Sequence, residues 1–146
     1  MREHTTWEIR SPLAPDRVIA APIEFTDDRA RIWRETSHPD VYRVHARGPT
    51  WMEVTEGIPR AWSRGRHDWS APGIVALYQL DSNIAEPGGL IVYRIDADGN
   101  GSTVRCERLR SFRVTRAGRL AAVYMRPFVP RILCDQFAAG LRRIGD

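Results

Sequence analysis

Polar and apolar residues alternate in short stretches along much of the chain, and this period of two predicts β-strands. Near the start, Thr5, Trp7 and Ile9 alternate with polar neighbours, which predicts a first strand. From residue 41 onward, similar stretches are separated by short turns rich in Gly and Pro, so neighbouring strands should pair antiparallel as a meander. These later strands are predicted over residues 42–47, 51–56, 61–70, 74–81, 90–95 and 103–114.

Two short helices are predicted between the first strand and the meander. Pro15 suits a first helical turn and opens a helix over residues 16–21, which Pro22 ends. Thr26 and the two aspartates that follow it can cap a second helix over residues 29–35. Both helices are too short to be stable without packing on a sheet.

The last third of the chain has the spacing of an amphipathic helix. Leu133 and Phe137 belong to an apolar stripe that should face the sheet. Pro127 and Pro130 separate this helix from the apolar residues 120–125, so we expect a kink or break there. The full order predicts an α+β helix-grip fold, in which a curved antiparallel sheet of about seven strands surrounds a long C-terminal helix.

The composition fits one globular domain. With 146 residues, the chain has a common single-domain size, so we expect residues 1–146 to form one unit. No apolar stretch approaches the roughly 20 residues that span a bilayer, and the N-terminus lacks a secretory core, which predicts a cytoplasmic protein without a membrane span. In that compartment, Cys106 and Cys134 should be reduced thiols.

All 22 basic residues are arginine, and the formal net charge is +4. The arginines are spread along the chain among acidic residues, whereas nucleic-acid surfaces usually carry a clustered basic stripe. This pattern argues against nucleic acid as the partner and favours an ordinary solvated surface.

Four segments carry a resemblance to a known family: SPLAPDR at 11–17, WMEVTEG at 51–57, RHDWSAPG at 66–73 and RILCDQFAAGLRRI at 131–144. With the order of elements, they resemble the START-like superfamily, often labelled SRPBCC, which includes polyketide cyclases and dehydrases and lipid-transfer domains. The resemblance implies a cavity between sheet and last helix that holds a small hydrophobic or aromatic molecule. The superfamily supplies no shared catalytic residues, and we expect no cofactor. The stretch RIWRETSHPDVYRVH departs from the tryptophan-rich segment usual in the superfamily.

One stretch, residues 96–107, matches the pattern of a calcium loop, with a glutamate at its twelfth position. A calcium loop lies between two helices, whereas the residues on both sides here alternate like strands. An extended segment from Gly101 would carry the carboxylate of Glu107 about 20 Å from the turn, far beyond a coordination distance of about 2.5 Å. We therefore predict a hairpin turn and no metal site.

The alternation of side chains along the strands decides between the roles of two polar residues, Arg108 and His67. Arg108 shares a face with Val104 and Cys106, and its guanidinium could hold a carboxylate or phenolate end of a ligand there. The alternatives are an arginine that extends to water at the rim, or one paired with an acidic residue. His67 and Asp68 are adjacent in a strand and point to opposite faces, so they cannot form an acid/base pair.

Two functions remain open, and catalytic residues are not identified. The first is a binder of a small hydrophobic or aromatic ligand, with cyclase- or dehydrase-like activity in which His67 or Glu107 would titrate. The second is an interaction module that docks on RNA, a ribosome or an acidic protein. Aromatic residues suit a cavity wall, although each can equally be core. The predicted ligand-binding residues are Trp51, His67, Trp69, Tyr78, Tyr93, Arg108 and Phe137.

Overall fold

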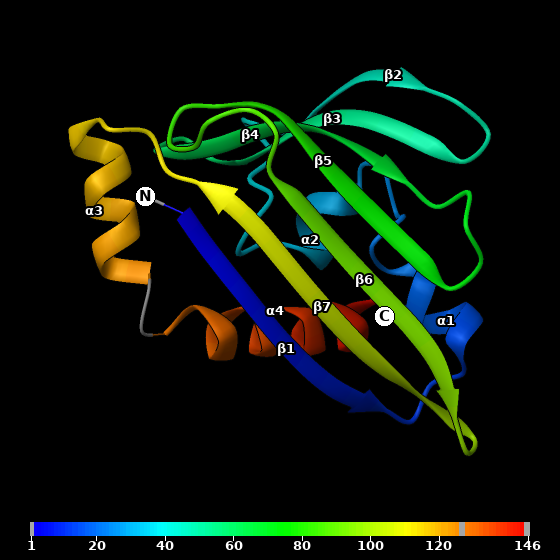
Figure 1. Ribbon diagram of the computed structural model, residues 1–146. Coiled ribbons are helices and arrows are strands. Elements are labelled where there is room, and N and C mark those ends of the chain that lie inside the picture. The colour runs from blue at the N-terminus through cyan, green and yellow to red at the C-terminus, as the bar shows by residue number, and fades with distance from the viewer. Residues whose placement is uncertain (1, 126–127, 145–146) are drawn as a thin grey trace.

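The computed structural model describes residues 2–125 and 128–144, and it confirms the helix-grip fold. One curved antiparallel sheet has the strand order β1-β7-β6-β5-β4-β3-β2, so β2 to β7 form a continuous meander and β1 pairs with β7 (Figure 1). The strands are β1 (Arg2–Ser11), β2 (Arg43–Arg47), β3 (Trp51–Ile58), β4 (Ala61–Asp68), β5 (Ile74–Ser82), β6 (Leu90–Asp98) and β7 (Gly101–Ser111).

The turn between β6 and β7 is the segment that resembles a calcium loop. Asp98 pairs with Gly101 as the last pair of the ladder, and Gly99 has a φ of +61°, which favours glycine at this tight turn. The predicted hairpin is therefore confirmed. Among the described residues, no cluster of three or more His, Cys, Asp or Glu side chains has the arrangement of a metal site.

The helices lie on the concave side of the sheet or beyond its end (Figure 1). Two short helices, α1 (Pro15–Ala20) and α2 (Arg29–Ile32), follow β1 as predicted. The C-terminal helical region consists of two helices, α3 (Arg116–Met125) and α4 (Val129–Arg143), as the prolines predict, and Pro127 lies outside the described residues. Within the described ranges, no helix is both long and apolar enough to cross a membrane.

Helix α4 is held against the sheet and α2 by aromatic packing. The ring of Phe137 lies 5.3 Å from Trp7, 5.3 Å from Tyr93 and 5.5 Å from Trp33, measured between centroids. Gly140 permits the close approach of α4 to α2, because a Cβ atom at this position would lie 2.5 Å from the Trp33 ring. These ring contacts hold α4 against β1, β6 and the C-terminal end of α2.

Candidate functional site

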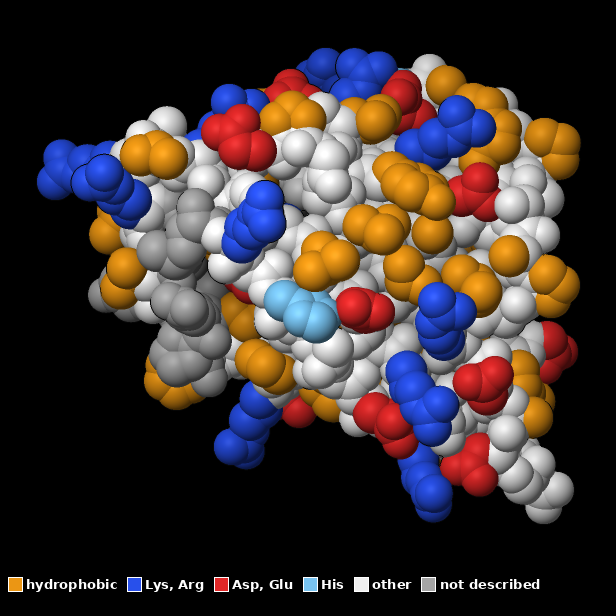
Figure 2. Space-filling view, viewed as in Figure 1, with side chains coloured by type: hydrophobic (Ala, Val, Ile, Leu, Met, Phe, Trp, Pro, Cys, Tyr) orange, Lys and Arg blue, Asp and Glu red, His pale blue; other side chains and the backbone are white. Residues whose placement is uncertain are grey.

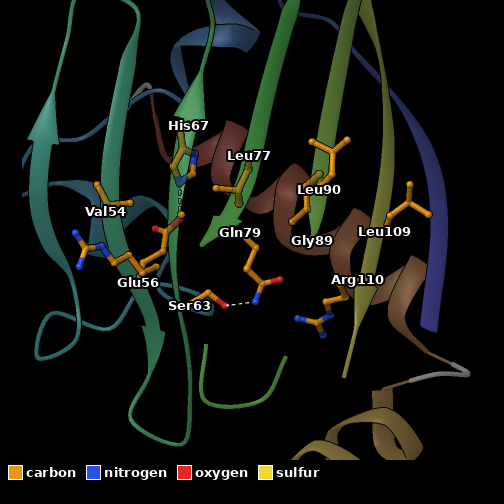
Figure 3. Close-up of a pocket in the computed structure, with 13 residues that line it drawn as sticks. Val54, Glu56, Ser63, His67, Leu77, Gln79, Gly89, Leu90, Leu109 and Arg110 are labelled. Carbon is orange, nitrogen blue, oxygen red and sulfur yellow. Dashed lines mark hydrogen bonds and ion pairs between the residues drawn. The ribbon is translucent and has the colours of Figure 1, made fainter. Parts of the chain in front are cut away.

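Two hollows open on the concave side of the sheet. The first, which we call the sheet hollow, is lined by residues of β3 to β7, and has a cavity volume of about 60 Å³ (Figure 3). The second, the aromatic hollow, lies between the sheet and α4, and has a cavity volume of about 70 Å³. Ile91 lines both hollows, so a single side chain belongs to both walls.

The sheet hollow combines an apolar wall with a few polar groups. Val54 and Leu77 are part of its apolar wall, while Gln79 donates a hydrogen bond of 3.3 Å to the hydroxyl of Ser63. Figure 3 shows the side chains of Glu56 and His67 pointing toward one another at the upper part of the same hollow. Such an arrangement, mostly apolar with a few polar groups, is typical of small-molecule sites.

A buried chain of charged and polar groups connects α2 to this hollow. Arg29 donates to both carboxylate oxygens of Glu56, at 2.9 Å each, and also to the backbone carbonyl of Pro22 at 2.8 Å. His67 Nε2 lies 3.4 Å from Glu56 Oε1 on the neighbouring strand. The edge of the His67 ring also meets Phe25, at 4.9 Å between centroids. Glu56 is thus held on one side by a cation and faces an imidazole on the other.

This environment sets the protonation states of the histidine and the glutamate. Burial lowers the pKa of His67, although the Glu56 carboxylate opposes that shift, so the imidazole is neutral at pH 7. The pKa of Glu56 lies well below its usual range, because the attraction of Arg29 and the contact with His67 outweigh the burial that would raise it. An ionised Glu56 accepts a hydrogen bond from Nε2–H, which leaves Nδ1 as the basic nitrogen of His67.

Aromatic rings and a guanidinium line the aromatic hollow. Trp7, Trp33, Tyr93 and Phe137 contribute rings, and Arg108 contributes the charge. Burial raises the pKa of Tyr93 above its ordinary value, so its phenol stays protonated at all physiological pH.

Arg108 points inward, as the parity of β7 predicts, and it is only 6% exposed. Its Nε atom lies 3.5 Å from Glu3 Oε1, and Arg110 Nε lies 3.8 Å from the same oxygen. Glu107 lies on the outer face, where its carboxylate is 3.0 Å from His4 Nε2, so the expectation that it acts in the cavity is wrong.

The structure places four of the seven predicted ligand-binding residues in the walls of the hollows, namely His67, Tyr93, Arg108 and Phe137. Trp69 follows the end of β4 and stacks on Phe25, at 5.8 Å between centroids, next to His67.

Trp51 and Tyr78 lie on the convex face, opposite to their expected position. Tyr78 is 48% exposed and alternates with the inward residues of β5, and Trp51 packs under the guanidinium of Arg66, 4.1 Å from its ring. Figure 2 views the convex side, where hydrophobic side chains gather over the central strands among charged ones. The sequence places these two rings on strands but does not show which face they occupy.

Three residues of the hollows and their surroundings are not predicted from the sequence: Glu3, Arg29 and Glu56. Glu3 and Glu56 could have been found by the same alternation, because Glu3 shares a face with Trp7, and Glu56 shares one with the buried Val54. Arg29 has no such signal, because its position against Glu56 depends on how α2 packs under the sheet.

Comparison with known proteins supports the fold but no particular activity. No family model matches the chain, and no curated protein matches it in sequence. An aromatase/cyclase from Streptomyces sp. R1128 is 15% identical, with a TM-score of 0.72 over 97% of this chain and 90% of that chain. A START superfamily protein from Mycobacterium smegmatis is 7% identical, with a TM-score of 0.70 over 97% of this chain and 98% of that one.

A plant enzyme has the same architecture with a ligand bound. Norcoclaurine synthase from Thalictrum flavum, in complex with dopamine and hydroxybenzaldehyde, is 6% identical, with a TM-score of 0.66 over 99% of this chain and 86% of that chain. At these identities, the likeness concerns the fold alone. The chain therefore shares the helix-grip fold of these structures.

Proposed function

We propose that the interior between the concave face of the sheet and α4 binds a small hydrophobic or aromatic molecule. The observation that carries this proposal is the pair of largely apolar hollows, each of which contains a few buried polar groups. The aromatase/cyclase and the norcoclaurine synthase of the same fold are consistent with an aromatic ligand, by analogy of fold.

The two hollows must join to hold a ligand of ordinary size. Each is well below the roughly 300–1,000 Å³ of typical ligand sites. Ile91 lines both hollows. We propose that a change of its rotamer, together with a small shift of α4, connects them. The proposed site is therefore one continuous space that opens when the ligand enters.

Thermal shift and native mass spectrometry against a panel of lipids and polyphenols test this proposal. The matched variants are Ile91→Phe, which fills the shared wall, and Val92→Phe, which places the same ring on the opposite face of β6. Binding should raise the melting temperature of the wild type and of Val92→Phe, because a ligand that binds the folded state stabilises it, and should be lost in Ile91→Phe.

Two results would contradict the pocket. Equal binding by Ile91→Phe and Val92→Phe would place the ligand elsewhere on the surface. No binding of the panel, combined with an affinity for RNA that falls steeply with salt, would favour an interaction module instead.

The pair of His67 and Glu56 favours a second, catalytic function of the same site. With Nε2 directed at Glu56, the neutral imidazole can accept a proton at Nδ1 from a bound substrate and return it to a leaving hydroxyl, as cyclisation and dehydration require. Holding a flexible substrate in a folded pose would supply much of the remaining rate.

This catalytic proposal is tested with a linear poly-β-ketone analogue and mass spectrometry of its products. The wild type should accelerate loss of water, and His67→Gln should reduce the rate by about a hundredfold or more, as expected for removal of a general base. His45→Gln, on the exposed outer part of β2, is the control. An unchanged rate in His67→Gln would exclude this role.

A further inference from the structure

Two residues that line the aromatic hollow, Trp7 and Arg108, each have a buried hydrogen-bond donor without an acceptor. Within the described part of the chain, neither Trp7 Nε1 nor Arg108 Nε has a hydrogen-bond partner. Their residues are 8% and 6% exposed, respectively. Buried donors are nearly always paired in folded proteins, and leaving one unpaired is unfavourable, so two in the same hollow require an explanation.

The two donors belong to neighbouring positions on one face of the sheet. In the register of β1 and β7, Trp7 lies opposite Cys106, and Thr5 lies opposite Arg108. Trp7 and Arg108 are therefore diagonal neighbours, and both side chains line the aromatic hollow. One oxygen-bearing group in this hollow could thus accept hydrogen bonds from both residues.

The nearby carboxylate of Glu3 pairs with the guanidinium of Arg108 but does not accept a hydrogen bond from its Nε–H. Its Oε1 atom is 3.5 Å from Arg108 Nε, beyond a good charge-assisted hydrogen bond, and the same oxygen is 3.8 Å from Arg110 Nε and accepts a bond of 3.4 Å from the Thr5 hydroxyl. Glu3 stabilises the guanidinium charge inside the protein, but it leaves the Nε–H free to bind another acceptor.

The walls of the aromatic hollow indicate which kind of molecule would carry that acceptor. The rings of Trp33, Tyr93 and Phe137 form an apolar surface suited to a planar ring, and an anionic oxygen suits a guanidinium and an indole N–H. We infer that the aromatic hollow recognises an aromatic carboxylate, whose carboxylate accepts hydrogen bonds from Arg108 and Trp7. This inference rests on the proposed function and specifies the class of its ligand.

Isothermal titration calorimetry with 2-naphthoate and 2-naphthamide tests the inference. The two probes have the same ring and nearly the same shape, but only the first carries a negative charge at pH 7. The wild type should bind 2-naphthoate about tenfold or more tightly than 2-naphthamide, since one charge-assisted hydrogen bond accounts for at least that factor. This comparison needs no variant, so it does not depend on how a substitution affects folding.

Three variants assign the preference to its residues. Arg108→Gln should reduce the ratio of the two affinities to about one, and Trp7→Phe, which keeps a ring but loses the N–H, should reduce it in part. Arg105→Gln removes an exposed arginine of the same strand, paired with Glu8 at 2.8 Å, and should leave the ratio unchanged. Equal losses in Arg108→Gln and Arg105→Gln would show a general charge effect and overturn the inference.

These experiments distinguish a failure of this inference from a failure of the proposed function. Equal affinity of the wild type for both probes would overturn the recognition of a carboxylate by Arg108 and Trp7, while it would support an apolar binding site. Binding of neither probe would overturn the inference, and the proposed function would also fail if the lipid and polyphenol panel gave no binding.

Discussion

Arg29 holds Glu56 through two parallel hydrogen bonds of 2.9 Å, one to each carboxylate oxygen. The arginine belongs to the short helix α2 and the glutamate to the inward face of β3, so this pair joins a helix to the sheet beside the sheet hollow. The Arg29 guanidinium also lies 4.5 Å from the centre of the Phe25 ring. Because Glu56 in turn contacts His67, the arginine positions the group for which we propose acid/base chemistry.

Replacing Arg29 with Met should destabilise the protein strongly. The side chain of Arg29 is only 6% exposed, and its loss would leave the Glu56 carboxylate buried without its cation. We expect the free energy of unfolding, measured with urea, to fall by about 3–5 kcal/mol. The double variant Arg29→Met with Glu56→Leu should recover much of that loss, because no unpaired charge remains.

Arg34→Met is the control, since Arg34 has a side chain that is 70% exposed and pairs with Glu35 at 3.4 Å. Exposed ion pairs contribute about 0–1 kcal/mol, so this variant should change stability little. A similar effect of both single variants would mean that the pair of Arg29 and Glu56 has no special role.

The fold could be predicted from the sequence because alternation, turns and helical spacing all indicate the same architecture. The inward position of Arg108 follows from the same alternation, as its partners Val104 and Cys106 are apolar. The expectation from residue type is wrong at Trp51 and Tyr78, because a large aromatic ring does not by itself indicate an inward position. Both occupy the convex face, because the apolar neighbours Met52 and Leu77 take the inward positions.

The contacts of Glu56 with Arg29 and His67 beside the sheet hollow could not be predicted from the sequence. Alternation could place Glu56 inward, but its partner Arg29 comes from a helix 27 residues earlier in the chain. Only the packing of α2 under β3 brings the two together, and no local pattern encodes that contact. Asp68 is adjacent to His67 in the sequence, but it lies on the other face of the sheet. Its carboxylate accepts hydrogen bonds from Ser70.

The contribution of His67 to stability should depend on pH. Burial lowers its pKa in the folded protein below the value of about 6.5 in the unfolded chain, so the unfolded chain binds the proton more readily. The stabilisation that comes from the neutral His67 is therefore fully present well above pH 6.5, and it is lost as the pH falls below that value. The free energy of unfolding, compared between pH 7.5 and pH 5.5, should decrease by at most about 1.4 kcal/mol on account of this residue.

The variant His67→Gln isolates this effect. It should lose the part of the pH dependence that lies between pH 7.5 and 5.5, whereas His45→Gln, on exposed β2, should keep it. Glu56 contributes at lower pH, since its depressed pKa adds stability that is lost as the pH falls below about 4.3. An identical pH profile in the wild type and His67→Gln would show that the histidine is not the titrating group.

Gly140→Ala should destabilise the protein, in contrast to most substitutions of glycine by alanine inside a helix. Helix propensity alone favours alanine by about 1 kcal/mol. The new methyl group, however, would lie 2.5 Å from the Trp33 ring, which is itself held by a hydrogen bond of 3.1 Å from its Nε1 to the carbonyl of Ala21. We expect a net loss of about 1–3 kcal/mol in urea denaturation. Asp135→Ala, at an exposed position of α4, should not destabilise the protein, and a gain in stability for Gly140→Ala would contradict the observed packing.

Cys106 should resist alkylation in the folded protein. Its side chain lines the aromatic hollow, its residue is 4% exposed, and burial raises the pKa of its thiol to about 12. Since the thiolate is the nucleophile, iodoacetamide at pH 8 should modify Cys106 at least about a hundredfold more slowly than in urea. Mass spectrometry of the Cys134→Ser variant follows Cys106 alone, and the Cys106→Ser variant reports Cys134, which is only partly buried on α4 and should react first. Rapid modification of Cys106 without denaturant would mean that the space between β7 and α4 opens readily to solvent, and protection by a bound ligand would then place that ligand in the aromatic hollow.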